Sequence, residues 1–335
     1  MSSTGASIID ELPGPDGRRP LSGDQAGTGR LGDRIFKAAA SGAGGIVVVL
    51  VVLVGAFLLI TAIPALRGNT ANFFTARDFT TSPLHFGIVQ LLWTTVMSSV
   101  IALVIAVPFA IAIALFLTQY APRWLARPGA AVIDLLAAVP SIVYGLWGAY
   151  VVAPKFVPVQ DAIQTVFGWV PFLKGVPSVS GGTTILFVGL ILSIMILPII
   201  TAISREVFAQ TPMTHKEGAI ALGATKWEMI RTAVLPFGKP GVISASMLGL
   251  GRALGETIAV MLILSTIPNG APWTWSFFNG GSTFASLIAS NAPEAISDMR
   301  QMGAYIAAGL VLFVLTFVVN VIARVIIERR KAFTE

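Results

Sequence analysis

Long apolar segments alternate with short polar ones along this chain of 335 residues. Six apolar segments hold about 20 residues or more, which lets an α-helix cross roughly 30 Å of hydrocarbon. Strands of a membrane barrel would be shorter and would alternate apolar with polar positions. The pattern therefore predicts six membrane-spanning helices, at Ile46–Leu66, Ile88–Thr118, Ala130–Val152, Thr184–Ser204, Val242–Ile267 and Gly303–Ala323.

Composition supports the same class of protein. Apolar residues make up 55% of the chain and charged residues only 11%, and the mean hydropathy is +0.82. A soluble domain of this length carries about a quarter charged residues. Cysteine is absent, which excludes disulfides and thiolate chemistry. We therefore expect an all-α integral membrane protein.

The basic residues are distributed unevenly between the two sides of the predicted spans. Of the 22 Lys and Arg residues, 16 lie before the first span, in alternate connections and after the sixth span, whereas 5 lie in the other connections. By the positive-inside rule, both termini are expected to be cytoplasmic. The bias also accounts for the net charge of +6, so nucleic-acid binding is not indicated. The one remaining basic residue, Arg252, lies inside the fifth span.

Between and before the spans, the chain changes character. Residues 1–33 hold scattered Gly, Pro, Ser and Asp and few large apolar groups, which is typical of a flexible tail. Residues 34–331 are expected to form one transmembrane domain. The external connections Ala153–Gly182 and Pro268–Met302 are rich in Trp, Phe, Pro and Gly. They would serve as interfacial anchors, or would roof a cavity and meet an external partner.

The cytoplasmic loop 205–241, between spans four and five, carries helix start and stop signals. These are, in order, the capping box Thr214-x-x-Glu217, then Gly223, the capping box Thr225-x-x-Glu228, and Pro236. They predict two short helices with a sharp bend at Gly223 and a stop at Pro236. Such a bent pair of helices forms a projecting surface that another protein can bind. The alternative is an ordinary helical surface loop.

Span five combines a positive and a negative charge at Arg252 and Glu256, four residues apart and hence on one face of a continuous helix. Charges in a membrane face the protein interior, and a guanidinium fits a tetrahedral oxyanion through two parallel hydrogen bonds. Glu256 would neutralise Arg252 between transport events and keep anion binding weak. Ser141 and Tyr144, after Pro140 in span three, would add hydroxyl donors. The alternatives are a structural charge pair and a packed kink.

Other site chemistry is missing from the sequence. Neither His85 nor His215 has a partner at metal-ligand spacing, so no metal or cofactor is expected. The nearest approach to a phosphate-binding loop, Gly218-x4-Gly223-Ala224-Thr225, lacks the required Lys. The chain is therefore not expected to be an enzyme. Energy for uphill transport would come from a separate ATPase.

Two sets of residues carry a family resemblance. Glu217-Gly218-Ala219-x3-Gly223-x9-Ala233-Val234-Leu235-Pro236 resembles the pattern E-A-A-x3-G-x9-I-x-L-P of bacterial ABC importer permeases, with Gly218 and Ala233 as departures. "PSIVYGLWG" at 140–148 and "GRALGETIAVML" at 251–262 resemble the phosphate-specific importer permeases of the PstC type. The resemblance covers roughly residues 35–330.

The resemblance implies a type I ABC importer permease-like fold in the bacterial cytoplasmic membrane, and a permease subunit for inorganic phosphate. It implies that an ATP-binding subunit grips loop 205–241 at Glu217, Gly218, Ala219, Gly223 and Pro236. The implied partners are a PstA-like second permease, two copies of a PstB-like ATP-binding subunit and a PstS-like external phosphate-binding protein. The substrate path would use Arg252, Glu256, Ser141 and Tyr144. An importer for another small oxyanion, a secondary anion transporter and a membrane enzyme are the alternatives.

Overall fold

The computed structural model describes residues 29–175, 181–267 and 271–331. The chain divides into two compact units, Met1–Ala56 and Phe57–Glu335. In the first unit, the described residues form the greater part of α1 (Gly29–Gly68), an apolar helix whose side chains are nearly all exposed. Most of the predicted tail, residues 1–28, lies outside the described residues, and residues 29–33 begin α1.

Six helical segments of the described chain are long and apolar enough to cross a membrane, which confirms the predicted number. Apart from one short hairpin, β1 (Phe79–Thr81) and β2 (Leu84–Phe86), the regular secondary structure of the described chain is helical. The helices after α1 are α2 (Val89–Leu115), α3 (Arg123–Ala137), α4 (Ser141–Trp147), α5 (Ala153–Phe167), α6 (Ile185–Ala209), α7 (Met213–Ala221), α8 (Lys226–Met229), α9 (Leu235–Leu254), α10 (Ile258–Ile263), α11 (Phe284–Asn291) and α12 (Met299–Lys331).

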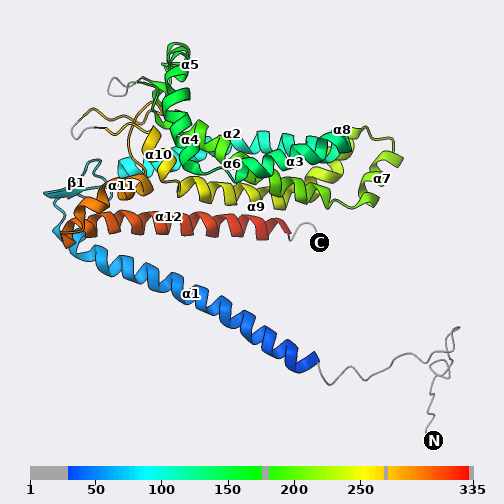
Figure 1. Cartoon of the computed structure of the whole chain (residues 1–335), viewed down its shortest axis with the longest axis horizontal. Helices are drawn as coiled ribbons and strands as arrows, with labels where there is room; N and C mark the ends of the chain where they lie inside the picture. The colour runs from blue at the N-terminus through cyan, green and yellow to red at the C-terminus, as the bar shows by residue number, and fades with distance from the viewer. Residues whose placement is uncertain (1–28, 176–180, 268–270, 332–335) are drawn as a thin grey trace, which may run out of the picture. The chain divides into compact units, whose positions relative to one another are not determined.

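Helix α6 is the centre of the second unit. Of its most apolar window, 67% is buried, against 28% or less for the other spanning segments. It packs against α2, α3 and α9, which run beside it in Figure 1. A Cβ at Gly189 would meet the Ile101 side chain at 2.6 Å, and one at Gly249 would meet Ile200 at 2.9 Å. Small residues thus allow the close helix contacts typical of membrane bundles.

The prediction that Pro236 ends a helix is wrong. The chain stays helical from Lys226 to Leu254, and a five-residue π-helical turn, Ile230–Val234, comes directly before α9. A proline in an α-helix clashes with the carbonyl four residues earlier, and a π-turn widens the helix at that point. The same arrangement recurs at Gly148–Val152, two residues before Pro154. Both prolines are therefore accommodated inside helical segments.

The predicted third span, Ala130–Val152, is not one helix. Helix α3 ends at Ala137 and α4 begins at Ser141, with Pro140 in extended conformation at the start of α4. The residue before a proline is driven out of helical geometry, and this separates the two helices. The membrane-length helical segment in this region is Ser141–Phe167.

The predicted fifth span, Val242–Ile267, is also interrupted. Helix α9 ends at Leu254 with Gly255 as its C-terminal cap, and the six-residue α10 starts at Ile258. Non-helical backbone at membrane depth is tolerated only where protein buries it or where it lines a cavity. The break at Gly255 therefore lies where other protein segments bury the backbone or where the backbone lines a cavity.

The two long connections that the sequence predicts to be external pack against each other. The Phe277 N–H donates to the Phe172 carbonyl at 2.8 Å, and the Ser276 hydroxyl donates to the Lys174 carbonyl at 2.6 Å. The Phe172 and Phe277 rings stack on Trp93 near the start of α2. The connections that carry these rings lie at the end of the helical bundle opposite α7 and α8 (Figure 1).

Candidate functional site

Arg252 lies in the last turn of α9, immediately before the break at Gly255. Its side chain is exposed in this chain and has no hydrogen bond or ion pair among the described residues. An arginine at the centre of a membrane helix costs about 2.5–3.5 kcal/mol on insertion scales. A second protein surface or a water-filled path must therefore cover this face of α9.

Glu256 lies beyond the break and behaves differently from Arg252. It is 9% exposed, and its Oε1 accepts a hydrogen bond from the Ala259 N–H at 3.1 Å. The carboxylate thus pairs with one of the free N–H groups in the first turn of α10. An ion pair of 3.4 Å joins Arg205 to Asp134, and among the described residues neither Arg252 nor Glu256 takes part in one. The two charges of span five therefore flank a break instead of sharing one helix face, and they are not paired.

Tyr144 connects the two helices that meet at Pro140. Its hydroxyl donates to the carbonyl of Leu136, near the end of α3, at 3.0 Å, and the residue is 8% exposed. The Val139 N–H donates to the same carbonyl at 3.3 Å, so the Tyr144 hydroxyl is a second donor at the end of α3. Ser141 is one turn earlier on the same short helix and is half-buried. Tyr144 thus holds the break in shape, and Ser141 keeps a hydroxyl without a bond to protein in the described structure.

The two helix breaks lie beside each other. A Cβ at Gly145 in α4 would be 3.0 Å from the Ala259 Cα in α10, so the two short helices are in close contact. Discontinuous membrane helices are a common way to build a substrate or ion site at membrane depth. The structure thus brings Glu256, which caps α10, close to the helix of Tyr144, and Arg252 lies in the last turn of α9 just before the same break.

Loop 205–241 forms the bent pair of helices that the sequence predicts. Gly223 has φ +84°, and its N–H donates to Ile220 while the Ala224 N–H donates to Ala219. These two bonds are the Schellman arrangement, in which a residue with positive φ ends a helix and reverses the chain. Of the two predicted capping boxes, the one at Thr225 is present with both of its hydrogen bonds.

The other predicted capping box, at Thr214, is absent. Helix α7 starts at Met213 with Pro212 as its N-terminal cap and no side-chain hydrogen bond there. Pro212 fixes an extended conformation directly before Met213, so the helix begins at Met213. Thr214 then lies inside the first turn and is not in the capping position.

The outer surface of α7 and its turn is apolar and open. Leu222 is 90% exposed, Met213 63% and Ile220 56%. Glu217 and Gly218 are exposed as well, whereas Ala219 packs towards the core cluster at the base of the loop. Grouped exposed hydrophobic residues mark surfaces that meet other proteins or membranes. Figure 1 shows α7 at one end of the helical bundle.

Sequence reasoning missed a polar cavity at the opposite end of the bundle. It has a volume of about 210 Å³ and its polar lining is Gln90, Thr266, Ser282 and Asn291. Its lining comes from the start of α2 and from the connection 265–295, which are distant in sequence, so no local motif marks it. The polar side chains offer both hydrogen-bond donors and acceptors and no formal charge.

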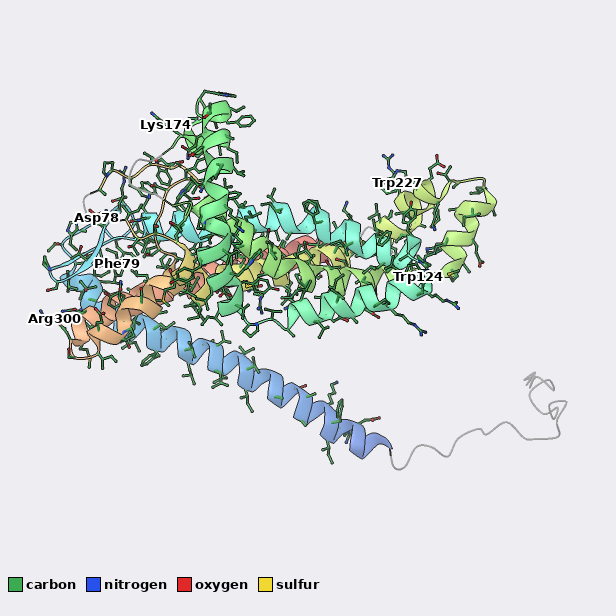
Figure 2. The ribbon with its side chains drawn as sticks, turned by 45° about the horizontal axis from the view of Figure 1, so that its top comes forward. Asp78, Phe79, Trp124, Lys174, Trp227 and Arg300 are labelled. Atoms are coloured by element: carbon green, nitrogen blue, oxygen red, sulfur yellow. The ribbon has the colours of Figure 1, made fainter. Side chains whose placement is uncertain are left out.

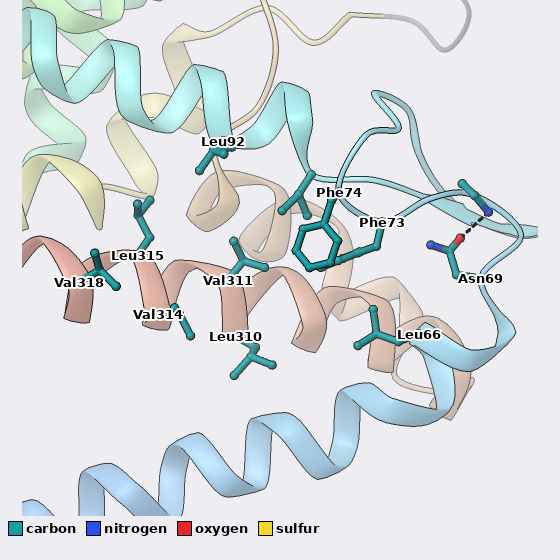
Figure 3. Close-up of a pocket in the computed structure, with 12 residues that line it drawn as sticks. Leu66, Asn69, Phe73, Phe74, Leu92, Leu310, Val311, Val314, Leu315 and Val318 are labelled. Atoms are coloured by element: carbon teal, nitrogen blue, oxygen red, sulfur yellow. Dashed lines mark hydrogen bonds between the residues drawn. The ribbon is translucent and has the colours of Figure 1, made fainter.

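A second cavity, of about 730 Å³, has a different character (Figure 3). Apolar side chains from the end of α1, the connection after it, the start of α2 and α12 line it, among them Leu66, Phe74 and Val314, and Asn69 is its one polar side chain. The Asn69 amide is occupied by hydrogen bonds with the Phe86 backbone. This cavity therefore suits apolar groups and not an anion.

Comparison with known proteins gives the family. Residues 106–332 match the family of binding-protein-dependent transport system inner membrane components. The phosphate transport system permease protein PstC 2 of Mycobacterium tuberculosis is 56% identical over 301 residues, which cover 89% of this chain and 92% of that protein. PstC of Mycobacterium leprae is 54% identical over 298 residues, with 88% and 92% covered. An inward-facing MetNI methionine ABC transporter has a TM-score of 0.48 at 16% identity, covering 73% of this chain and 94% of that one.

The family match includes both helix breaks and loop 205–241, since all of them lie within residues 106–332. The six spanning helices agree with a multi-pass protein of the bacterial inner membrane. More than half of the aligned residues are identical to those of a PstC protein over most of both chains. The chain therefore belongs to the binding-protein-dependent transport system inner membrane components and, within them, to the PstC-type phosphate transport system permeases.

Proposed function

We propose that this chain is a permease subunit of an ATP-driven phosphate importer, in which the paired helix breaks form part of the phosphate path. The observation that carries the proposal is Arg252, an exposed guanidinium without a protein partner in the described structure, placed beside a broken membrane helix. The names of the relatives, phosphate transport system permease proteins, support phosphate as the substrate.

The chemistry of the site fits a passing anion. A guanidinium stays charged and offers parallel N–H donors to a tetrahedral oxyanion, and Ser141 adds a neutral hydroxyl. Glu256 is buried on the other side of the break, so its charge limits how tightly an anion binds and aids release. Tyr144 is a positioning residue in this scheme, because its hydroxyl hydrogen bonds to Leu136.

A PstA-like second permease subunit would complete the path. Arg252 and the neighbouring Gly255 are exposed in this chain, and a Cβ at Gly251 would meet nothing within 4 Å. A second set of helices against this face would shield the charge from lipid and leave an internal space for the anion.

ATP hydrolysis would take place in two copies of a separate, PstB-like subunit. One of these copies would bind loop 205–241. Glu217, Gly218, Ala219, Gly223 and Pro236 are the proposed coupling residues. The exposed apolar side chains around Leu222 supply the surface for that contact. In this scheme residues 1–33 are a tail and residues 34–331 the permease domain.

At the opposite end of the bundle, a PstS-like binding protein would deliver phosphate. The start of α2 and helix α11, which contribute Gln90 and Asn291 to the polar cavity, lie on that side, away from α7 (Figure 1). The cavity offers neutral donors to an anion on its way to Arg252.

Uptake in cells that lack other phosphate carriers tests the function directly. We expect purification of this chain to recover an ATP-binding subunit and a second permease, and expect uptake of labelled phosphate that stops when the ATP-binding subunit is inactivated. Excess unlabelled phosphate should compete, and sulfate should not. Equal competition by sulfate would indicate another oxyanion, and uptake driven by an ion gradient alone would indicate a secondary transporter.

Reporter fusions test the orientation that the basic residues predict. A reporter fused after Lys331 should be active only in the cytoplasm, and one inserted at Ala271 only outside, because the bias of basic residues places these positions on opposite sides. Activity on the same side at both positions would contradict the proposed topology.

A further inference from the structure

An apolar groove of about 410 Å³ lies between α2 and the helical segment that begins at Lys226, here called the α2–α8 groove. One wall is a single face of α2 and of the π-helical turn after it, from Pro108 to Tyr120. The other wall is formed by Trp227 and Leu235. The volume falls within the range of roughly 300–1,000 Å³ that is typical of small-molecule sites.

The groove is as deep as one leaflet of a bilayer. Both of its walls belong to membrane-spanning segments, Val89–Tyr120 and Lys226–Leu254. At about 1.5 Å per residue, the twelve steps from Pro108 to Tyr120 rise about 18 Å, slightly more than half of the roughly 30 Å hydrocarbon core. The space therefore fits an extended hydrocarbon chain that enters from the α7 side.

The rim of the groove carries the residues that membrane proteins place at lipid headgroups. Trp227 is 56% exposed and Tyr120 47%. The Lys226 Nζ lies 4.6 Å from the centroid of the Tyr120 ring, which fixes an ammonium group over the mouth of the groove. Figure 2 shows Trp124 at the same end of the bundle as Trp227. Amphipathic rings of this kind sit at the membrane interface.

The charges around the rim are mainly positive. Arg231, on the helical segment that starts at Lys226, is exposed, as is Arg123 at the start of α3. The acidic residue nearby, Glu228, accepts hydrogen bonds from the backbone N–H and the hydroxyl of Thr225, both at 2.8 Å. Lys226 is therefore available to an anionic group that lies above the groove.

We propose that the α2–α8 groove binds an anionic glycerophospholipid of the leaflet on the α7 side. One acyl chain fills the apolar groove, and the lipid phosphate contacts the Lys226 ammonium between Tyr120 and Trp227. The bound lipid holds the start of the helix that follows the Gly223 bend. The membrane thereby supports the loop on which ATPase coupling is proposed to depend.

Trp227 is a built-in reporter for this site. The assembled transporter is reconstituted in phosphatidylcholine vesicles with a minor fraction of brominated phosphatidylglycerol or brominated phosphatidylcholine, since bromine quenches nearby indole emission. The fluorescence emission of Trp227 is obtained by subtracting the emission of the Trp227→Phe variant from that of the unchanged protein. We expect stronger quenching by the brominated phosphatidylglycerol, and we expect Lys226→Gln to reduce that preference about fivefold.

Three controls separate this lipid from other occupants. Lys239→Gln removes an exposed lysine on the same spanning segment that does not line the groove, and should keep the preference. Ala112→Phe partly fills the groove and should reduce quenching by both lipids. Saturating inorganic phosphate should leave the preference unchanged.

Equal quenching by the two lipids, or an unchanged preference in Lys226→Gln, would contradict the proposal. Loss of the preference on adding inorganic phosphate would assign the rim to free phosphate. An absence of quenching by either lipid would show that a protein surface covers the groove, and would also overturn the proposal.

Discussion

Replacing Arg252 by lysine should lower phosphate uptake per assembled transporter about tenfold or more. Lysine keeps the positive charge but loses the planar fork of donors, and one charge-assisted hydrogen bond is worth about 1.5–3 kcal/mol. Arg252→Ala should abolish uptake. Because Arg252 forms no ion pair in the described structure, neither change should cost the chain much stability. The measurement is phosphate uptake normalised to the amount of assembled complex.

Companion variants separate a substrate path from a structural charge pair. Glu256→Gln keeps an oxygen that accepts from the Ala259 N–H and removes only the charge, so helix α10 should stay capped. The double variant Arg252→Ala with Glu256→Gln should fold, assemble and still fail to transport. Arg252→Ala with Glu256→Ala should also fail, and should assemble less well because the cap is lost.

Arg205→Lys serves as the matched control, because it can keep the ion pair with Asp134 while making the same change of side chain. Its uptake should be close to normal. Normal uptake per complex by the Arg252→Ala, Glu256→Gln double variant would show that the pair is not on the phosphate path, even though the family assignment would stand.

Gly223→Val should uncouple ATP hydrolysis from transport. Gly223 has φ +84°, and a residue with a Cβ pays roughly 1–2 kcal/mol in that conformation. A Cβ there would meet nothing within 4 Å, so the effect comes from backbone strain and not from a clash. That energy lowers the population of the bent loop about 5–30-fold. Assembly with the ATPase and substrate-stimulated ATP hydrolysis should both fall.

Gly218→Ala is the companion variant in the same helix, and it installs the alanine that the importer pattern has at this proposed coupling position. A Cβ at Gly218 would also meet open space, but its backbone is helical, so alanine should stabilise α7 by about 0.5–1 kcal/mol. Coupling should therefore be retained or improved. Capture of phosphate by the external binding protein should be unchanged in both variants. Full transport by Gly223→Val would remove the reason to assign coupling to this bend.

Local sequence rules predicted much of the fold. The first, second, fourth and sixth spans lie within or close to helices of the structure, because hydropathy over about 20 residues is a property of the segment itself. The Gly223 bend and the Thr225 capping box were predicted for a similar reason. Each depends on the backbone conformation and hydrogen bonds of fewer than seven neighbouring residues.

The structure places the predicted site residues on separate elements and not on two continuous helices. Arg252 lies in the last turn of α9, Glu256 in the break before α10, and Tyr144 on the short helix α4. Hydropathy continues across Pro140 and Gly255 without a change, so the apolar pattern alone did not reveal either break. The polar cavity could not be predicted, since Gln90 and Asn291 are about 200 residues apart and each is unremarkable alone.

The sequence by itself determined that the chain enters a membrane, how many times helices can cross it, and where loop 205–241 bends. These properties depend on transfer of apolar segments from water and on local backbone geometry, which neighbouring residues control. Only the tertiary structure decided that the helix continues past Pro236, that two helix breaks lie beside each other, and that Glu256 caps α10 while Arg252 stays exposed. Close packing between segments that are distant in sequence, such as Gly145 against Ala259, holds the interrupted helices together, and no local pattern specifies that packing.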